Sequence, residues 1–263
     1  MPRRRMSIAT GIVVVVVAAC AATVPPYNPF KIPRTDIEGR IRTVVIVPFV
    51  TIQIDSPDAV TTSFEALIAT KLRNAGYTVV PSAAYEAVWE RAKQQIGGYF
   101  DPVTGRRDEA KFKAVRTHAL REIADTEKVD ATVGCIIRPV TAAFAAGTAY
   151  WHGVSEPIAT GGFWSRVGTG DSHGTAPALS LVIVMEGIDG QELFVNAGGI
   201  QLLQTVEYGK FVDVPKAQLL SDAARNATAV DIALAPLVGP PGGTPTPVYD
   251  GRGRTPTPRN GMP

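Results

Sequence analysis

The chain has 263 residues, of which 45% are hydrophobic and 19% charged, and its formal net charge is +2. Arg3, Arg4 and Arg5 supply that excess, because the rest of the chain holds nearly equal numbers of acidic and basic residues. A nucleic-acid-binding protein needs a concentrated basic face, so the composition argues against nucleic acid as a partner.

The first element in chain order is the apolar run "GIVVVVVAAC" at residues 11–20, which follows the three arginines. The run is too short to cross a bilayer, which takes roughly 20 apolar residues. Basic residues followed by a short apolar stretch and small residues are typical of a secretory signal, and we assign residues 1–19 to one. A buried cytosolic strand would explain the valines, but it would not explain the arginines or the small residues.

The end of this run, "VAAC" at residues 17–20, resembles the lipobox of bacterial lipoproteins. The resemblance implies cleavage before Cys20, acylation of that residue, and a stable lipid anchor in a membrane without a spanning helix. In the same family an aspartate after the cysteine retains the protein in the inner membrane, so Ala21 implies the periplasmic face of the outer membrane.

Two flanking segments are rich in proline. Residues 20–41 comprise Cys20 and a segment with little periodicity, which predicts a short tether after the lipidated residue. Residues 239–263 repeat the motif Thr-Pro-Thr-Pro and are rich in glycine, so we expect a disordered tail. A proline-rich docking segment is the alternative for the tail.

Residues 42–238 are long enough for one domain with a sizeable core. Runs rich in β-branched residues predict strands, helical spacing of apolar residues predicts helices, and Asp108 is a plausible cap for the third helix. The predicted strands of the first half are 42–50, 77–82 and 131–144, and the helices follow Ser56-Pro57-Asp58, Ser82 and Asp108. Alternation of strands and helices favours an α/β fold with at least one parallel pair of strands.

The second half changes to antiparallel signals. Two strand-like runs within 179–199 surround Asp189-Gly190, which predicts a two-residue type I′ hairpin. A closing helix is predicted around 216–234. We therefore predict an α/β class with a mixed sheet, helices packed on it, and an antiparallel hairpin in the second half.

Three segments carry a resemblance to a known group of domains: "RTVVIVPFV", "KLRNAGYTVVPS" and "DATVGCIIRPV". Their order resembles the periplasmic domain of penicillin-binding-protein activator lipoproteins, the curli-secretion lipoprotein and the Tol translocation protein N-terminal domain. The segments "GYFDPVTG" and "WHGVSE" also resemble lipoproteins of uncharacterised function. The resemblance implies a protein that scaffolds or regulates envelope machines through an envelope protein partner, and no enzyme.

Two other interpretations, a catalytic site and a metal site, have less support in the sequence than an accessory protein does. The segment "GDSHG" at 170–174 matches G-x-S-x-G, but the motif needs a preceding strand, a following helix and a downstream histidine, and only the adjacent His173 follows Ser172. His152, Glu156, Asp171 and His173 could ligate zinc, but their spacing fixes no geometry. We expect no catalytic residue, metal or cofactor. The alternatives are a ligand- or glycan-binding domain, or a hydrolase or metal-binding protein that uses loop 161–174.

The segment from Tyr150 to His173 is predicted to be a long loop, and loops of that length are usually functional or disordered. It concentrates aromatic side chains, which are frequent in interface hot spots. The candidate partner-binding residues are Tyr150, Trp151, His152, Phe163 and Trp164. The alternative is that these rings cover one edge of the core.

We predict that Cys20 carries the lipid anchor. Mass spectrometry of the protein from native membranes should find acyl groups on Cys20. Cys20→Ala should leave the protein unlipidated, either unprocessed or released in soluble form, whereas the control Cys135→Ala should keep the anchor. Wild-type protein without acyl groups on Cys20 would contradict the assignment.

Overall fold

The structure is a computed structural model that describes residues 27–54, 57–159 and 173–239. The helices are α1 (Arg34–Arg40), α2 (Asp58–Asn74), α3 (Ser82–Ile96), α4 (Glu109–Glu127), the 3₁₀ turn η1 (Lys216–Gln218) and α6 (Ala223–Val238). The strands are β1 (Thr43–Ile46), β2 (Val50–Thr51), β3 (Thr78–Val80), β4 (Ala131–Ala145), β5 (Thr148–Trp151), β6 (Val154–Pro157), β7 (His173–Gly187), β8 (Glu192–Leu202), β9 (Gln204–Glu207) and β10 (Lys210–Asp213). The predicted signal peptide, Cys20 and the tail beyond Gly239 lie outside the described residues.

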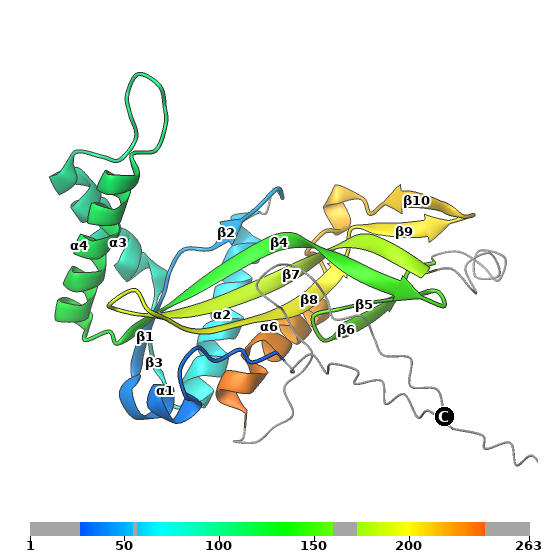
Figure 1. Cartoon of the computed structure of the whole chain (residues 1–263), viewed down its shortest axis with the longest axis horizontal. Coiled ribbons are helices and arrows are strands. Elements are labelled where there is room, and N and C mark those ends of the chain that lie inside the picture. Colours follow the sequence, from blue (N-terminus) through cyan, green and yellow to red (C-terminus); the bar gives the residue numbers. More distant parts are fainter. Residues whose placement is uncertain (1–26, 55–56, 160–172, 240–263) are drawn as a thin grey trace, which may run out of the picture.

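The strands form a mixed sheet around β4, as predicted (Figure 1). β1 pairs in parallel with both β3 and β4, whereas β7 runs antiparallel to β4 and β8 antiparallel to β7. The predicted strand 42–50 is wrong in its middle, because β1 ends at Ile46 and pairing resumes at β2. Pro48 lies between them and has no N–H to donate to a neighbouring strand.

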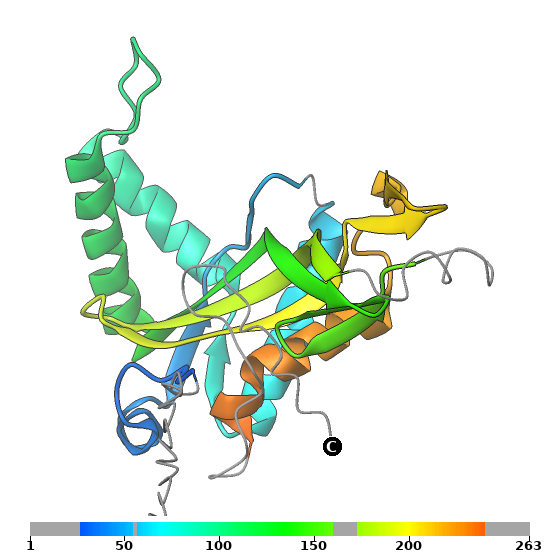
Figure 2. The same cartoon turned by 45° about the vertical axis from the view of Figure 1, so that its right-hand side comes forward.

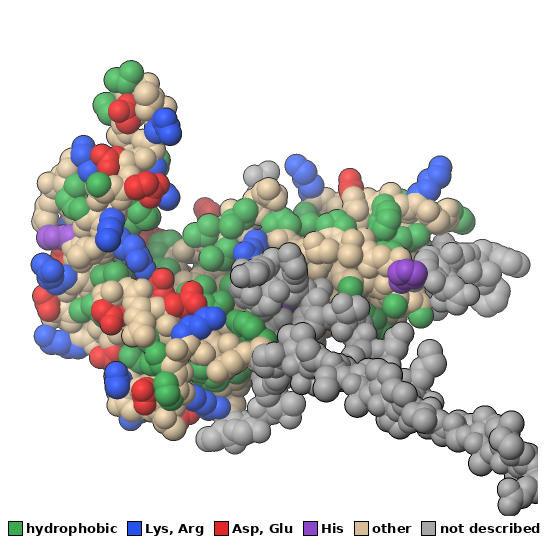
Figure 3. All heavy atoms as spheres, viewed as in Figure 1, with side chains coloured by type: hydrophobic (Ala, Val, Ile, Leu, Met, Phe, Trp, Pro, Cys, Tyr) green, Lys and Arg blue, Asp and Glu red, His purple; other side chains and the backbone are tan. Residues whose placement is uncertain are grey.

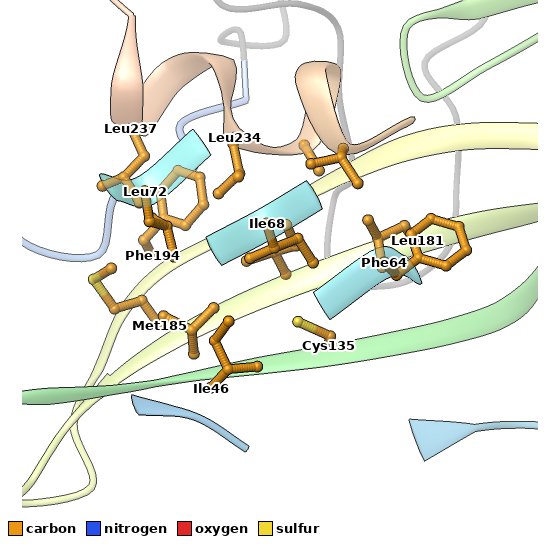
Figure 4. Close-up of a cluster of buried hydrophobic side chains, with 14 of the residues drawn as sticks. Ile46, Phe64, Ile68, Leu72, Cys135, Leu181, Met185, Phe194, Leu234 and Leu237 are labelled. Carbon is orange, nitrogen blue, oxygen red and sulfur yellow. The ribbon is translucent and has the colours of Figure 1, made fainter. Parts of the chain in front are cut away.

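Helices cover both faces of the parallel part of the sheet. Val44 and Ile46 of β1 face the core cluster that includes α2 and α6, whereas Val45 between them faces α3 and α4. This two-sided burial explains why the sequence of β1 is continuously apolar. Figure 4 shows the larger cluster, where side chains from the sheet meet those of the two helices: Ile46, Phe64, Ile68, Leu72, Cys135, Leu181, Met185, Phe194, Leu234 and Leu237.

The thiol of Cys135 lies in this cluster and is 1% exposed. Burial raises the pKa of the Cys135 thiol well above its usual range, and the negative charge of Glu65 adds to the effect. Since the thiolate is the reactive form, the residue acts as a small apolar side chain.

The segment before β1 packs on the domain, so the predicted tether is wrong from Tyr27 onward. The Phe30 ring lies 5.3 Å from that of Phe194, the backbone N–H of Lys31 donates to Leu193 O, and Ile37 of α1 is fully buried. Two apolar side chains in a proline-rich stretch, without helical or strand periodicity, gave no signal of this packing.

Two boundaries in the second half differ from the prediction. The β7–β8 hairpin forms, but only Gly190 of Asp189-Gly190 has positive φ, so the turn is a type I turn followed by a glycine bulge. The closing helix α6 begins at Ala223 and not near 216, because Asp222 accepts hydrogen bonds from the N–H groups of Ala224 and Arg225. The predicted cap of α4 is confirmed, since Asp108 accepts from the N–H of Lys111.

Gly198 allows α6 to lie directly on β8. A Cβ atom at Gly198 would lie 2.0 Å from Ala229 O, which is backbone and has no flexible end that could move. By contrast, a Cβ atom at Gly134 of β4 would lie 3.6 Å from its nearest neighbour, the Val47 side chain, an ordinary contact distance. The close packing of α6 on β8 therefore requires a residue without a side chain at position 198.

Gly198→Ala should destabilise the protein by about 1–3 kcal/mol or more, because the added methyl group forces α6 away from β8. Gly134→Ala, the matched control in the same sheet, should cost little. Urea unfolding of both variants measures the difference. Equal stability of the two variants would show that the contact between α6 and β8 is less close than described.

Candidate functional site

The aromatic candidates Tyr150, Trp151 and His152 lie in a hairpin, so the prediction of a loop from residue 150 is wrong for this part. β5 and β6 are joined by a two-residue turn in which His152 and Gly153 have φ of 36° and 81°. Positive φ at both positions matches a type I′ turn. Phe163 and Trp164 lie outside the described residues.

Trp151 attaches this hairpin to the sheet. Its side chain is 2% exposed, and its ring N–H donates to Leu179 O at 3.0 Å. A Cβ atom at Gly199 of β8 would lie 2.8 Å from the Trp151 ring nitrogen and 2.2 Å from a methyl group of Val154. Gly199 therefore provides the space in which the hairpin packs against β8.

His152 makes a second attachment. Its Nδ1 lies 2.7 Å from the hydroxyl oxygen of Ser180, and both side chains are buried. The His152 carbonyl also accepts a hydrogen bond from the N–H of Gly199. Tyr150 precedes this pair on β5 and remains 42% exposed. Of the three candidates in the hairpin, two are buried and Tyr150 is accessible.

The catalytic and metal-binding candidates are distributed over separate places. Ser172 and Asp171 lie outside the described residues, and His173 is the exposed first residue of β7. His152 is buried against Ser180, whereas Glu156 lines a cavity elsewhere. In residues 27–54, 57–159 and 173–239, no three His, Cys, Asp or Glu side chains lie close enough together to hold a metal ion.

A projecting loop at the other end of the molecule contains most of the segment "GYFDPVTG" but was not among the predicted partner-binding residues. Residues 99–108, here called the finger, extend beyond the ends of α3 and α4 (Figures 1 and 2). Phe100 and Arg107 pair as a β-bridge, Asp101 N donates to Arg106 O at 2.8 Å, and Gly105 N donates to Asp101 O at 2.9 Å. The finger is thus a short hairpin with its own backbone hydrogen bonds.

Asp101 fixes the turn at the outer end of the finger. Its Oδ1 accepts hydrogen bonds from the N–H groups of Thr104 at 2.7 Å and Val103 at 2.8 Å. These two bonds favour the carboxylate and hold the pKa of Asp101 below its usual value. The turn is therefore stabilised by one side chain.

Aromatic packing anchors the base of the finger. The Tyr99 ring lies 5.3 Å from that of Phe112 and 6.0 Å from that of Trp89, and the Arg107 guanidinium lies 4.5 Å from the centre of the Phe112 ring. Phe100 packs on the Tyr99 ring at 4.8 Å but remains 58% exposed, and Val103 in the outer turn is 91% exposed. Figure 3 shows hydrophobic side chains at the outer end of the finger.

The β9–β10 hairpin carries a second group of exposed apolar side chains, at the end of the sheet distant from the finger (Figure 1). Tyr208 is 85%, Phe211 52% and Val212 40% exposed. Val206 is buried, and its N–H donates to Ile158 O at 2.7 Å, which connects this hairpin to the chain after β6.

A cavity of about 650 Å³ lies between β6, the end of β8 and the start of α6. Glu156 is one of its charged lining residues, with Oε1 3.0 Å from an Arg225 guanidinium nitrogen. Burial raises the pKa of Glu156, and the Arg225 charge opposes that shift. The sequence named Glu156 as a metal-ligand candidate, but gave no sign of its pairing with a residue on α6.

No helix within the described part of the chain is long and apolar enough to cross a membrane.

Substitutions of Trp151 and Tyr150 test whether the buried Trp151 contributes more to stability than the exposed Tyr150 does. Trp151→Ala should cost about 3–5 kcal/mol of stability, because it removes a buried ring and leaves Leu179 O without its donor. Tyr150→Ala should cost much less. Chemical unfolding measures both, and a Trp151→Ala variant as stable as Tyr150→Ala would show that the ring is not a core residue.

No protein-family model and no curated protein matches the chain. Among solved structures, lipoprotein GNA1162 from Neisseria meningitidis is 18% identical with a TM-score of 0.31, and the match covers 68% of this chain and 90% of that one. A PelC dodecamer from Paraburkholderia phytofirmans is 12% identical with a TM-score of 0.32, and the match covers 76% of this chain and 89% of that one. The LpoB C-terminal domain from Salmonella enterica is 13% identical with a TM-score of 0.29, and the match covers 61% of this chain and 82% of that one. At these identities and TM-scores, the likenesses do not decide between the functions considered above.

Proposed function

We propose that this protein is a lipid-anchored accessory or assembly protein of the bacterial cell envelope and that it acts through protein–protein contacts. The observation that carries the proposal is the finger, whose exposed apolar end is held in one conformation by its own hydrogen bonds. The proposal includes the anchor at Cys20, a position at the periplasmic face of the outer membrane, and no catalytic role.

The finger has the properties of an element that inserts into a partner. Phe100 and Val103 expose apolar surface on a projection. Apolar surface exposed in this way commonly marks an interaction site. Because the Asp101 carboxylate already fixes the turn, little conformational entropy is lost when a partner binds.

The base of the finger supports the same role. The rings of Trp89, Tyr99 and Phe112 pack together where the finger leaves the helices, which attaches its base to α3 and α4. Arg107 adds an ion pair with Glu109 at 2.7 Å. A docking element needs a supported base of this kind. A loop that only connects two helices in solvent does not need one.

Photocrosslinking in native envelopes tests the proposal directly. A photoreactive amino acid at Val103 should give a discrete adduct with another envelope protein, because this side chain is 91% exposed at the end of the finger. The same amino acid at Glu127, an exposed position at the opposite end of α4, is the control and should give no such adduct.

Two substitutions check that the adduct depends on the shape and chemistry of the finger. Phe100→Ala removes apolar contact surface, and Asp101→Ala removes the two hydrogen bonds that fix the turn, so each should lower the adduct yield at Val103 while the thermal midpoint stays nearly unchanged. Identical adducts from Val103 and Glu127, or yields unaffected by either substitution, would contradict a docking role for the finger.

A further inference from the structure

The cavity next to Glu156 has a lining that the proposed protein contacts do not use. It is formed by three regions distant in sequence: the end of β6, the segment from the end of β8 through β9, and the segment from Val214 to Arg225. The polar side chains that line it are Glu156, Gln201, Thr205, Gln218, Ser221, Asp222 and Arg225. Its volume of about 650 Å³ lies within the range of about 300–1,000 Å³ that is common for small-molecule sites.

Gln201 is the residue that points most clearly to a ligand. The residue is 4% exposed, and its Oε1 accepts a hydrogen bond from the N–H of Leu220 at 2.9 Å. Its amide nitrogen makes no hydrogen bond within the described chain although it lines the cavity. This nitrogen is not one of the fully buried polar atoms that lack a partner, so it is accessible from the cavity and can donate to a ligand oxygen there.

Glu156 supplies an acceptor in the same cavity. Its Oε1 is paired with Arg225, but its Oε2 has only a long bond of 3.4 Å from the N–H of Leu202. The side chain is 16% exposed, so this oxygen is accessible mainly from the cavity. A ligand must therefore offer both an acceptor to Gln201 and a donor to Glu156.

The charges of the lining disfavour an anionic ligand. Glu156 and Asp222 carry two negative charges against the single positive charge of Arg225. Each carboxylate already has partners, because Arg225 pairs with both and Asp222 also caps α6. An uncharged molecule can bind through hydrogen bonds without displacing these partners.

The backbone around the cavity disfavours an extended peptide. Peptides add to a sheet through unpaired strand edges. Here Ala159 bridges to Val206, and the N–H of Val214 donates to Leu203 O. The segments after β6 and after β10 are therefore already held by backbone contacts beside the cavity.

We propose that this cavity binds an uncharged, polyhydroxylated ligand, one or two sugar units of a glycan. A hydroxyl group both donates and accepts a hydrogen bond, so neighbouring hydroxyls on a sugar ring satisfy Gln201 and Glu156 together. The apolar side chains of Pro157, Leu202 and Val214 complete the lining and would contact the C–H groups of the ring. This site is independent of the finger.

Binding of defined disaccharides to the purified full chain tests the proposal. Saturation-transfer NMR should detect saturable binding of cellobiose or N,N′-diacetylchitobiose, which are uncharged. The comparison ligands are the cationic disaccharide of glucosamine, the anionic disaccharide of galacturonic acid, and an acetylated alanine tetrapeptide. Each of these should bind more weakly than the uncharged sugars.

Two near-isosteric variants locate the binding. Gln201→Glu keeps the acceptor for Leu220 and removes the free amide donor, whereas Glu156→Gln replaces the carboxylate acceptor. Each should weaken binding of the uncharged disaccharide at least about tenfold, as expected for loss of a buried hydrogen bond. Gln94→Leu on α3 is a control outside the cavity, and its binding should equal that of the unaltered chain.

The folding of each variant is checked by its thermal midpoint, and Glu156→Gln alone decides the result if Gln201→Glu does not fold. The proposal is overturned if neither uncharged disaccharide binds, if binding survives in the folded variants, or if a charged sugar or the peptide binds better. Val103→Ser, a finger variant, should bind the disaccharide normally. Failure of the disaccharide-binding test therefore does not contradict the docking role of the finger, and failure of the crosslinking test does not contradict binding in the cavity.

Discussion

The pairing of β4 with β7 is the interaction on which the rest of the structure depends. The two strands are antiparallel and paired in unbroken register from Ala131 with Gly187 to Ala145 with His173. Every other strand of the main sheet is attached directly or indirectly to this pair, because β1, β2 and β5 pair with β4, and β8 pairs with β7. Helices α2 and α6 then cover one face of the sheet through the larger core cluster.

The β4–β7 pair is long, and the two candidate sites lie at its opposite ends. At one end, β1 and β3 support α3 and α4, which carry the finger (Figure 2). At the other end, the β5–β6 hairpin and the start of α6 enclose the cavity next to Glu156. Adjacent glycines in β8 make the second end possible: Gly198 admits α6 on one face, and Gly199 admits Trp151 on the other. A partner on the finger and a ligand in the cavity would therefore be held at a fixed separation.

Local signals in the sequence predict much of the fold, whereas the candidate sites depend on contacts that those signals do not contain. The β-branched runs, the Asp108 cap and the Asp189-Gly190 hairpin predict the mixed sheet and most helices. No similar signal marks β5 and β6, whose turns use Ala146-Gly147 and His152-Gly153 in place of the usual Asn-Gly. Aromatic residues there indicated a binding loop, but burial of Trp151 depends on Gly199, far along the chain. The exposure of Val103 and the meeting of Glu156 with Arg225 likewise follow only from tertiary packing.

The central claim is that β4 and β7 form one stable unit along their whole length and so hold both ends of the molecule together. Native-state hydrogen exchange of the backbone amides in these strands tests it most directly, since it measures the opening free energy of each segment. Amides near Ala142 and Ala176 should open with a free energy within about 1 kcal/mol of those near Val133 and Met185, all close to global unfolding. Fast exchange near Ala142 and Ala176, with slow exchange near Val133 and Met185, would show that the end bearing the cavity unfolds by itself and would contradict the account.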